Sequence, residues 1–161
     1  MTEDEIYAAW TADGISFTLV EHGAVFTVEE SAGIHDAVPG RHTKNLFLKD
    51  KRGAYWLVVL PADRRANLKS MAAVLGAGRF SFANPDDMLR LLGVTPGSVT
   101  PLAALSPTAA DVAVVFDATL AGSGQIAVHP LRNTATVALD FEEMIGWMSK
   151  QGRPCRIVDL P

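Results

Sequence analysis

A chain of 161 residues is long enough for one domain with a buried core and short for two. Its hydrophobic share of 48% and charged share of 20% are those of an ordinary globular protein, and no apolar run reaches the roughly 18 residues of a membrane span. One cysteine, Cys155, excludes an internal disulfide and a cysteine-based metal site. The acidic start, Met1 to Glu5, is unlike a secretory signal, so we expect a cytoplasmic protein without a membrane partner.

The net charge of −4 hides an asymmetry along the chain. Residues 1–40 carry eight acidic residues and no Lys or Arg, residues 41–90 carry ten basic and four acidic, and residues 91–161 carry four basic and six acidic. The middle segment therefore has a balance of +6, which suits a phosphate-bearing partner. The same charges could equally solvate strand and helix surfaces, so charge alone leaves both interpretations open.

The first part of the chain alternates short helices and strands. Apolar spacing and turn residues predict, in order, a helix over 3–12, a strand over 15–20, an extended piece over 24–28 and a helical turn within 29–35. Pro39-Gly40 then breaks the chain. Residues 46–48, a turn at 50–53 and residues 55–60 predict a β-hairpin, whose second strand is apolar throughout and is expected to be central.

The remaining elements complete a mixed pattern. We expect a helix over 67–75, an extended piece over 79–82, a helix from Asn84-Pro85, an ordered loop over 93–107, strands over 112–116, 125–128 and 135–139, a helix over 140–149 and an edge strand over 156–158. This order favours a single α+β domain with a mixed or mostly antiparallel sheet rather than a doubly wound one.

Three polar segments suggest one pocket assembled from distant parts of the chain. Lys44 and Asn45 enter an apolar strand, but neighbours on a strand face opposite sides unless the backbone is irregular. Residues 97–101 form a loop whose glycine allows a ligand to approach main-chain amides. His129 lies at a strand end before Pro130. The ordinary alternatives are an exposed lysine with a turn asparagine, a plain turn and a structural histidine.

Several common catalytic patterns are absent from the sequence. The histidines form no HExxH pair, the chain has no Gly-x-Ser-x-Gly elbow, and residues 97–101 lack the Gly-Lys-Ser/Thr ending of a Walker motif. No carboxylate pair indicates acid–base work. We therefore expect no metal, no cofactor and no conventional side-chain nucleophile.

Four stretches together resemble the YbaK/prolyl-tRNA synthetase-associated editing domains, and most closely their freestanding Ala-tRNA(Pro) deacylase branch. They are His42–Leu48, Leu68–Ala83, Leu92–Pro101 and His129–Thr136. The similarity covers nearly the whole chain, and its Lys-Asn pair and Gly-x-x-x-Pro loop are specific in combination. Other branches, similar to Cys-tRNA(Pro) deacylases, have Ser-Gly-Gly where this chain has His129-Pro130-Leu131, which argues against cysteine as the substrate.

The resemblance implies one domain over residues 1–161, with a mixed, mostly antiparallel, barrel-like sheet and surrounding helices, that hydrolyses misacylated tRNA. Lys44 would be the essential lysine and Asn45 its polar neighbour. The substrate-binding residues would be Gly97, Ser98, Val99, Thr100, Pro101 and His129. An aminoacyl ester is already activated, so a positioned water and main-chain oxyanion donors from the loop can be sufficient.

The partners implied are the alanine-bearing acceptor stem of tRNA(Pro) and, transiently, prolyl-tRNA synthetase, with no DNA partner. A small pocket excludes proline by size, but only the acceptor stem separates tRNA(Pro) from tRNA(Ala). The basic residues expected to contact it are Arg41, Lys49, Lys51, Arg52, Arg64, Arg65 and Lys69. Two alternatives stay open: a deacylase for another amino acid such as serine or cysteine, and a non-catalytic tRNA-binding module.

Overall fold

The computed structural model describes residues 1–23 and 38–161, so the predicted extended piece 24–28 and helical turn 29–35 lie outside the described residues. The strands are β1 (Phe17–Glu21), β2 (Arg41–Asp50), β3 (Tyr55–Pro61), β4 (Phe80–Phe82), β5 (Ala113–Asp117), β6 (Gln125–Val128), β7 (Ala135–Asp140) and β8 (Arg156–Val158). The α-helices are α1 (Glu3–Ala12), α3 (Leu68–Leu75), α4 (Pro85–Asp87) and α5 (Phe141–Lys150). Shorter helical turns are the π-helix η1 (Met88–Leu92) and the 3-10 helices η2 (Pro101–Leu105), η3 (Pro107–Ala109) and η4 (Ala118–Leu120).

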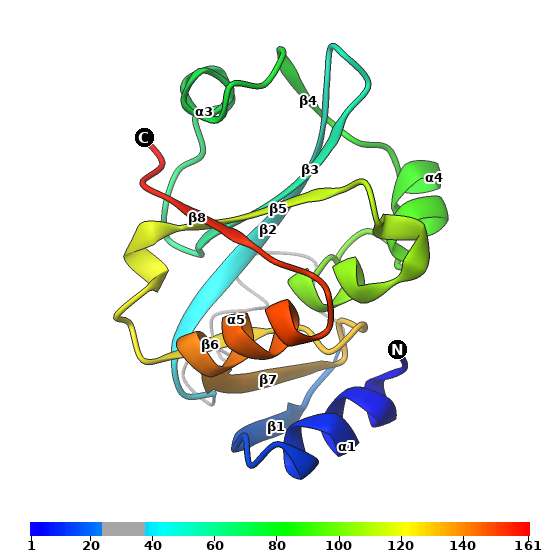
Figure 1. Ribbon diagram of the computed structural model, residues 1–161, viewed down its shortest axis with the longest axis vertical. Coiled ribbons are helices and arrows are strands. Elements are labelled where there is room, and N and C mark those ends of the chain that lie inside the picture. Colours follow the sequence, from blue (N-terminus) through cyan, green and yellow to red (C-terminus); the bar gives the residue numbers. More distant parts are fainter. Residues whose placement is uncertain (24–37) are drawn as a thin grey trace.

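The eight strands form one mixed sheet in the order β1-β7-β6-β2-β3-β5-β8, with β4 pairing to β2. Four of these pairings are antiparallel and three are parallel. The predicted α+β class with a mixed sheet is therefore confirmed. The order leaves β1 and β8 at opposite ends, so the described strands form an open sheet. In Figure 1, the long cyan strand β2 joins the half that contains β1, β6 and β7 to the half that contains β3, β4 and β5.

The β2–β3 hairpin is confirmed, and Asp50 closes its turn. The buried Asp50 carboxylate accepts hydrogen bonds from the main-chain N–H groups of Arg52, Ala54 and Gly78 and from the indole N–H of Trp56. Burial alone would raise the pKa of Asp50, but these donors favour the charged form and hold the pKa below its usual value. Residues Leu57 to Leu60 are at most 1% exposed, which confirms that β3 is central.

Side-chain caps set the helix boundaries that the sequence predicts. Thr2 and Glu5 form a reciprocal capping box at the start of α1. Asn67 caps α3, which ends at Gly76 with φ +69°, a left-handed conformation that favours glycine. The helix expected from Asn84 is present, but after one α-helical turn it continues as the wider π-helix η1. The ordered loop over 93–107 contains the 3-10 helix η2.

The sheet separates two large apolar cores, and a third, small cluster contains Val38, Ala127 and Ala138. Phe47 and Val59 belong to the larger core, which also contains Trp10 of α1 and Met144 of α5. Leu48, Val58 and Leu60 point to the other face and pack with Met71 and Leu75 of α3. Within residues 1–23 and 38–161, no helix combines the length and the apolar character needed to cross a membrane.

Candidate active site

An interruption in strand pairing along β2 marks the centre of the candidate site. On one side, β2 pairs with β3 continuously from Thr43 to Lys49. On the other side, β2 pairs with β6 only at residues 41–42 and with β4 only at residues 48–50. Among the described strands, none pairs with the stretch between them on that side, and this stretch contains Lys44 and Asn45. Phe47 is still bound on that side by the N–H of Ala83, so we call residues 43–46 the open edge of β2.

Main-chain groups of Asn45 point toward this open edge. Phe47 accepts a hydrogen bond at its carbonyl from the N–H of Ala83 on the β4 side, at 2.9 Å. Main-chain groups alternate in direction along a strand, so the N–H and C=O of Asn45 point the same way as those of Phe47. Because no described strand covers this edge, side chains from either face of the sheet can reach a ligand bound there.

The side chains of Lys44 and Asn45 lie on opposite faces of β2. Their register with β3 is unbroken, with Lys44 opposite Leu60 and Asn45 opposite Val59. Leu60 belongs to the core under α3 and Val59 to the larger core. The backbone irregularity needed to turn both side chains into one pocket is absent, so the two residues bracket the open edge from its two faces.

Within residues 1–23 and 38–161, Lys44 and Asn45 each carry a polar group without a partner. Lys44 is a residue of intermediate burial, and its ammonium makes no hydrogen bond or salt bridge to the described residues. The Oδ1 atom of Asn45 is buried and accepts no hydrogen bond from the part of the chain that the structure describes. A buried acceptor without a donor is costly, so a water or substrate donor at this position would be stabilising. Both groups are therefore available to a ligand.

The loop over residues 97–101 packs on the Asn45 face. Val99 belongs to the larger core together with Phe47 and Val59, and Thr100 is fully buried. Gly97 has φ +90°, which allows the turn in which the Ser98 N–H donates to the carbonyl of Thr95 at 3.0 Å.

Not every amide of this loop is free to bind a substrate. The Ser98 N–H is occupied in the turn, and Pro101 has no N–H. In the part of the chain that the structure describes, the N–H groups of Gly97, Val99 and Thr100 have no acceptor. Of the loop amides expected to donate to an oxyanion, only the N–H groups of Gly97, Val99 and Thr100 are therefore candidates.

His129 lies on the same face as Lys44, and a second histidine approaches it. Its ring centroid is 6.4 Å from that of His22, whose Nε2 lies 2.8 Å from the hydroxyl of Thr136. The strand register explains why His129 and Lys44 share a face. Ala127, two residues before His129, is paired with Ala138 of β7 and with His42 of β2. Thr136 lies two residues before Ala138, and His42 lies two residues before Lys44, so all of them are on this face. His22 could not be identified from the sequence, because no local spacing links it to His129.

The environment of His129 favours the neutral ring. Burial lowers its pKa, the nearby His22 lowers it further, and a hydrogen bond to the carbonyl of Ala135 opposes them. That bond joins Nδ1 to the Ala135 oxygen at 3.0 Å, so Nδ1 carries the proton and donates it. The Nε2 atom of the neutral ring is consequently an acceptor.

Replacing His22 with glutamine is expected to raise the pKa of His129. The substitution removes the neighbouring imidazole, whose electrostatic effect is one cause of the lowered pKa of His129. An NMR titration of the His129 ring in both proteins measures the change. Lys150→Gln removes an exposed cation on α5 and should leave the titration unchanged. An unshifted titration in His22→Gln would show that the two rings are not electrostatically coupled.

Arg132 fixes the loop that follows His129. Its guanidinium binds Glu3 of α1 at 2.8 Å and Glu21 of β1 at 2.6 Å, and it donates to the hydroxyl of Thr134 at 2.9 Å. The hydrogen bond from Arg132 lowers the pKa of Glu3. The preceding residue, Leu131, has φ +69°, a conformation that non-glycine residues rarely adopt. Arg132 is therefore a structural clamp between the N-terminal elements and the His129 loop.

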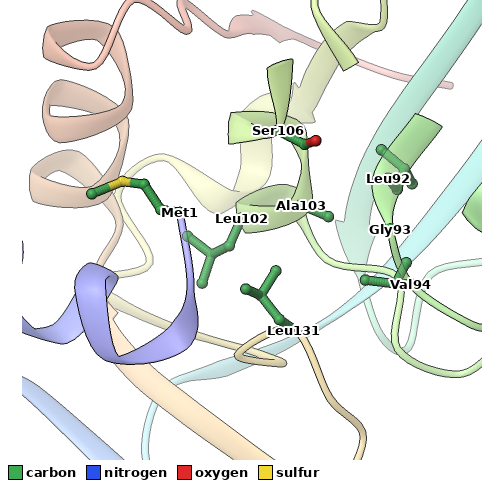
Figure 2. Close-up of a pocket in the computed structure, with 8 residues that line it drawn as sticks. All are labelled: Met1, Leu92, Gly93, Val94, Leu102, Ala103, Ser106 and Leu131. Carbon is green, nitrogen blue, oxygen red and sulfur yellow. The ribbon is translucent and has the colours of Figure 1, made fainter. Parts of the chain in front are cut away.

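A small pocket lined mainly by apolar side chains lies beside the 97–101 loop. Its volume is about 210 Å³, and it is lined by Met1, Leu92, Gly93, Val94, Leu102, Ala103, Ser106 and Leu131. Figure 2 shows Leu131 pointing into the space between Leu102 and Val94. Neither Lys44, Asn45 nor His129 lines this cavity, so it is separate from the open edge of β2.

The basic residues expected to contact tRNA form two groups at the two ends of the β2–β3 hairpin. Lys49, Lys51 and Arg52 lie at the turn end, and the remainder, Arg41, Arg64, Arg65 and Lys69, lie at the other end. Arg64 differs from the other residues of this set in its surroundings. Its guanidinium binds the fully buried Asp117 at 2.7 Å and the carbonyl of Leu160, so its charge is already engaged inside the protein.

Comparison with known proteins identifies the family of this chain. The sequence model described as the aminoacyl-tRNA editing domain matches residues 22–146, which include the open edge of β2, the 97–101 loop and His129. The chain belongs to the aminoacyl-tRNA editing domain family. Editing removes an amino acid from tRNA by hydrolysing its ester, so the chain is a hydrolase of this class.

Two relatives and one solved structure illustrate the range of the family. The prolyl-tRNA editing protein ProX of Acetoanaerobium sticklandii is 37% identical over 147 residues, covering 91% of this chain and 90% of the relative. The multifunctional Ser/Thr-tRNA deacylase ProXp-y of Escherichia coli K12 is 30% identical over 104 residues, 63% of this chain and 62% of the relative. A crystal structure described as a proposed trans-editing enzyme for prolyl tRNA synthetase shares the fold, with a TM-score of 0.72, 21% identity and coverage of 98% and 95%.

Proposed function

We propose that this chain is a trans-editing enzyme that hydrolyses alanine from Ala-tRNA(Pro), acting apart from prolyl-tRNA synthetase and meeting it only transiently. In this proposal, residues 1–161 act as one editing domain in the cytoplasm, with no metal or cofactor. The observation that carries it is the position of Lys44, a residue of intermediate burial beside the open edge of β2, whose ammonium has no partner among the described residues. A cation held in that position suits a phosphate or a developing oxyanion near the 3′ end of tRNA.

The reaction needs little from side chains. A water oxygen bonds to the ester carbonyl carbon, the carbon–oxygen bond to the ribose breaks, and the ribose hydroxyl leaves with a proton. The N–H groups of Gly97, Val99 and Thr100 would donate to the oxyanion of the tetrahedral intermediate. Lys44 would anchor the terminal phosphate or polarise the carbonyl, and the substrate's own ribose hydroxyl would assist the water.

Charge and size would select the amino acid. The substrate's α-ammonium would lie away from Lys44, because like charges in a pocket repel. The neutral His129 ring, with Nε2 as an acceptor, suits a neighbouring ammonium better than a protonated ring would. Asn45, with its unpaired Oδ1, would accept a further donor from the substrate or its water. A pocket sized for alanine would exclude proline by overlap.

The acceptor stem would distinguish tRNA(Pro) from tRNA(Ala), since the alanyl group is the same on both. The exposed basic residues at the two ends of the hairpin are our candidates for phosphate contacts, and Arg64 is not among them. The family resemblance and the ProX relative support proline editing. The E. coli relative, a Ser/Thr-tRNA deacylase, supports a second candidate, a deacylase for serine or another small residue.

Deacylation of five purified substrates tests the proposal: Ala-tRNA(Pro), Ala-tRNA(Ala), Pro-tRNA(Pro), Ser-tRNA(Pro) and Cys-tRNA(Pro). We expect rapid loss of alanine from tRNA(Pro), with the other four esters hydrolysed more slowly. Faster hydrolysis of the seryl ester would instead establish the second candidate. Binding of tRNA(Pro) with no hydrolysis of any ester would show a non-catalytic binding module and overturn the proposal.

A further inference from the structure

Phe82 is an exposed aromatic residue on a strand of the sheet. Its relative exposure is 63%, whereas Phe80, two residues earlier on β4, is 7% exposed and packs edge-on against Trp56 with centroids 5.7 Å apart. Large aromatic rings usually bury most of their surface, so a ring that is mostly in solvent at the end of a strand is available for a partner. No described aromatic ring packs against Phe82.

Phe82 lies on the same face of the sheet as Lys44. The register places Phe82 opposite Leu48 of β2, and residues at every second position share a face. Leu48, Leu46 and Lys44 therefore form one row on β2, and Phe82 extends it onto β4. Leu48 and Leu46 are packed with the core under α3. Lys44 at one end of the row and Phe82 at the other end lie outside that core.

The spacing fits a short stretch of single-stranded nucleic acid. Four residues separate Leu48 from Lys44, which is about 13 Å along a strand. Stacked nucleotides rise about 3.4 Å each, so this length is comparable to a few nucleotides at the 3′ end of tRNA. Phe82 also ends β4 beside the open edge of β2, where the N–H of Ala83 binds the carbonyl of Phe47.

The charges around this end of the sheet favour a nucleic acid over a protein surface. The exposed Lys51, Arg52 and Arg79 lie in the β2–β3 turn and at the residue before β4. Lys49 projects from the opposite face of β2, where its ammonium lies 5.6 Å from the centroid of the Tyr55 ring. Of the nearby carboxylates, Asp50 is bound by four donors and Asp87 is paired with Arg90 at 2.8 Å, which leaves Asp86 as the exposed one. A basic surface with an exposed aromatic ring is the usual platform for single-stranded nucleic acid.

We propose that Phe82 stacks on a base of the single-stranded 3′ end of the tRNA and holds that end beside the open edge of β2, near Lys44. The path follows the edge because the core under α3 covers the face between these two residues. The inference rests on the proposed function, because it takes the aminoacyl end of tRNA as the ligand. It adds a residue that binds the RNA by its aromatic face and has no part in hydrolysis. Stacking tolerates any base, so this contact contributes affinity and position, while the acceptor stem keeps the sequence selectivity.

Binding of uncharged RNA tests this contact without requiring hydrolysis. The probe is an acceptor-stem hairpin of tRNA(Pro) with its single-stranded 3′ end, and the proteins are wild type, Phe82→Ala, Phe82→Trp and Leu89→Ala. We expect Phe82→Ala to weaken binding by about 5- to 150-fold and Phe82→Trp to retain it. Leu89→Ala is the matched control, because Leu89 is 62% exposed on η1 and should not contact the RNA. A hairpin trimmed of its single-stranded end should bind wild type and Phe82→Ala equally.

Two results would overturn the inference. One is equal affinity of wild type and Phe82→Ala for the complete hairpin. This would show that Phe82 does not contact the RNA and would favour a protein partner such as the synthetase. The other is an equal loss with the trimmed hairpin, which would mean that Phe82 contacts the duplex or supports the fold. Because the RNA carries no amino acid, a failure of the deacylation experiment leaves this measurement interpretable.

Discussion

Replacing Lys44 with alanine is expected to slow deacylation of Ala-tRNA(Pro) by about 100- to 1,000-fold, the usual effect of removing one group that stabilises charge in a transition state. The described protein offers no partner for this ammonium, so the substitution removes a group that only the substrate would use. Single-turnover hydrolysis at saturating enzyme separates this effect from weaker binding.

Two further variants make the Lys44 experiment decisive. Lys150→Ala removes an exposed lysine on α5, paired with Asp13 at 3.3 Å, and should hydrolyse the ester at the wild-type rate. Lys44→Arg keeps the charge but changes its shape, so partial activity would indicate a point-charge role. Hydrolysis by Lys44→Ala at the wild-type rate would remove Lys44 from the mechanism and leave the loop amides as the main catalytic groups.

Replacing Asp117 with alanine should give the largest loss of stability, about 3–5 kcal/mol. The Asp117 side chain is fully buried and binds Arg64, Thr119 and the N–H of Leu160. Removing it leaves a partly buried guanidinium without its counter-ion and a buried N–H without its acceptor. Urea unfolding measures the change, and Asp63→Ala, which removes a carboxylate that is 85% exposed, should shift stability by no more than about 0.5 kcal/mol.

The same carboxylate predicts the direction of acid unfolding. Burial alone would raise the pKa of Asp117, but hydrogen bonds from Thr119 and Leu160 and the charge of Arg64 hold it below its usual value. A lowered pKa in the folded state stabilises the protein above the unfolded pKa of about 3.9, and this contribution is lost as the pH falls through the folded value. Asp117→Asn should therefore reduce the dependence of stability on pH in this acidic range.

Local structure could be predicted from the sequence because its causes are local. The β2–β3 hairpin follows from an apolar run and a turn, and the ends of α1 and α3 follow from Thr2, Asn67 and Gly76. The mixed class of the sheet follows from the order of the elements. The strand order could not be predicted, since the pairing of β1 with β7 or β2 with β6 depends on which distant faces bury each other.

The sequence predicted which residues belong to the candidate site better than it predicted how they are arranged in space. The sequence identified Lys44, Asn45, the 97–101 loop and His129, and their roles stay predictions. Their placement on two faces around an open strand edge depends on where β6 and β4 stop pairing with β2, which has no local signal. Two other contacts could not be predicted for the same reason, because each joins residues that are far apart in the sequence. These are the approach of His22 to His129 and the binding of Glu3 and Glu21 by Arg132.

The topology of the sheet also has a consequence for how fast and in what order the chain folds. The β2–β3 hairpin is closed by a short turn and can form early. The pairing of Phe17 with Leu139 joins positions near the two ends of the sequence, and such non-local contacts form slowly. During synthesis, β1 must therefore wait for β7 to leave the ribosome, with its apolar residues exposed to chaperones until then.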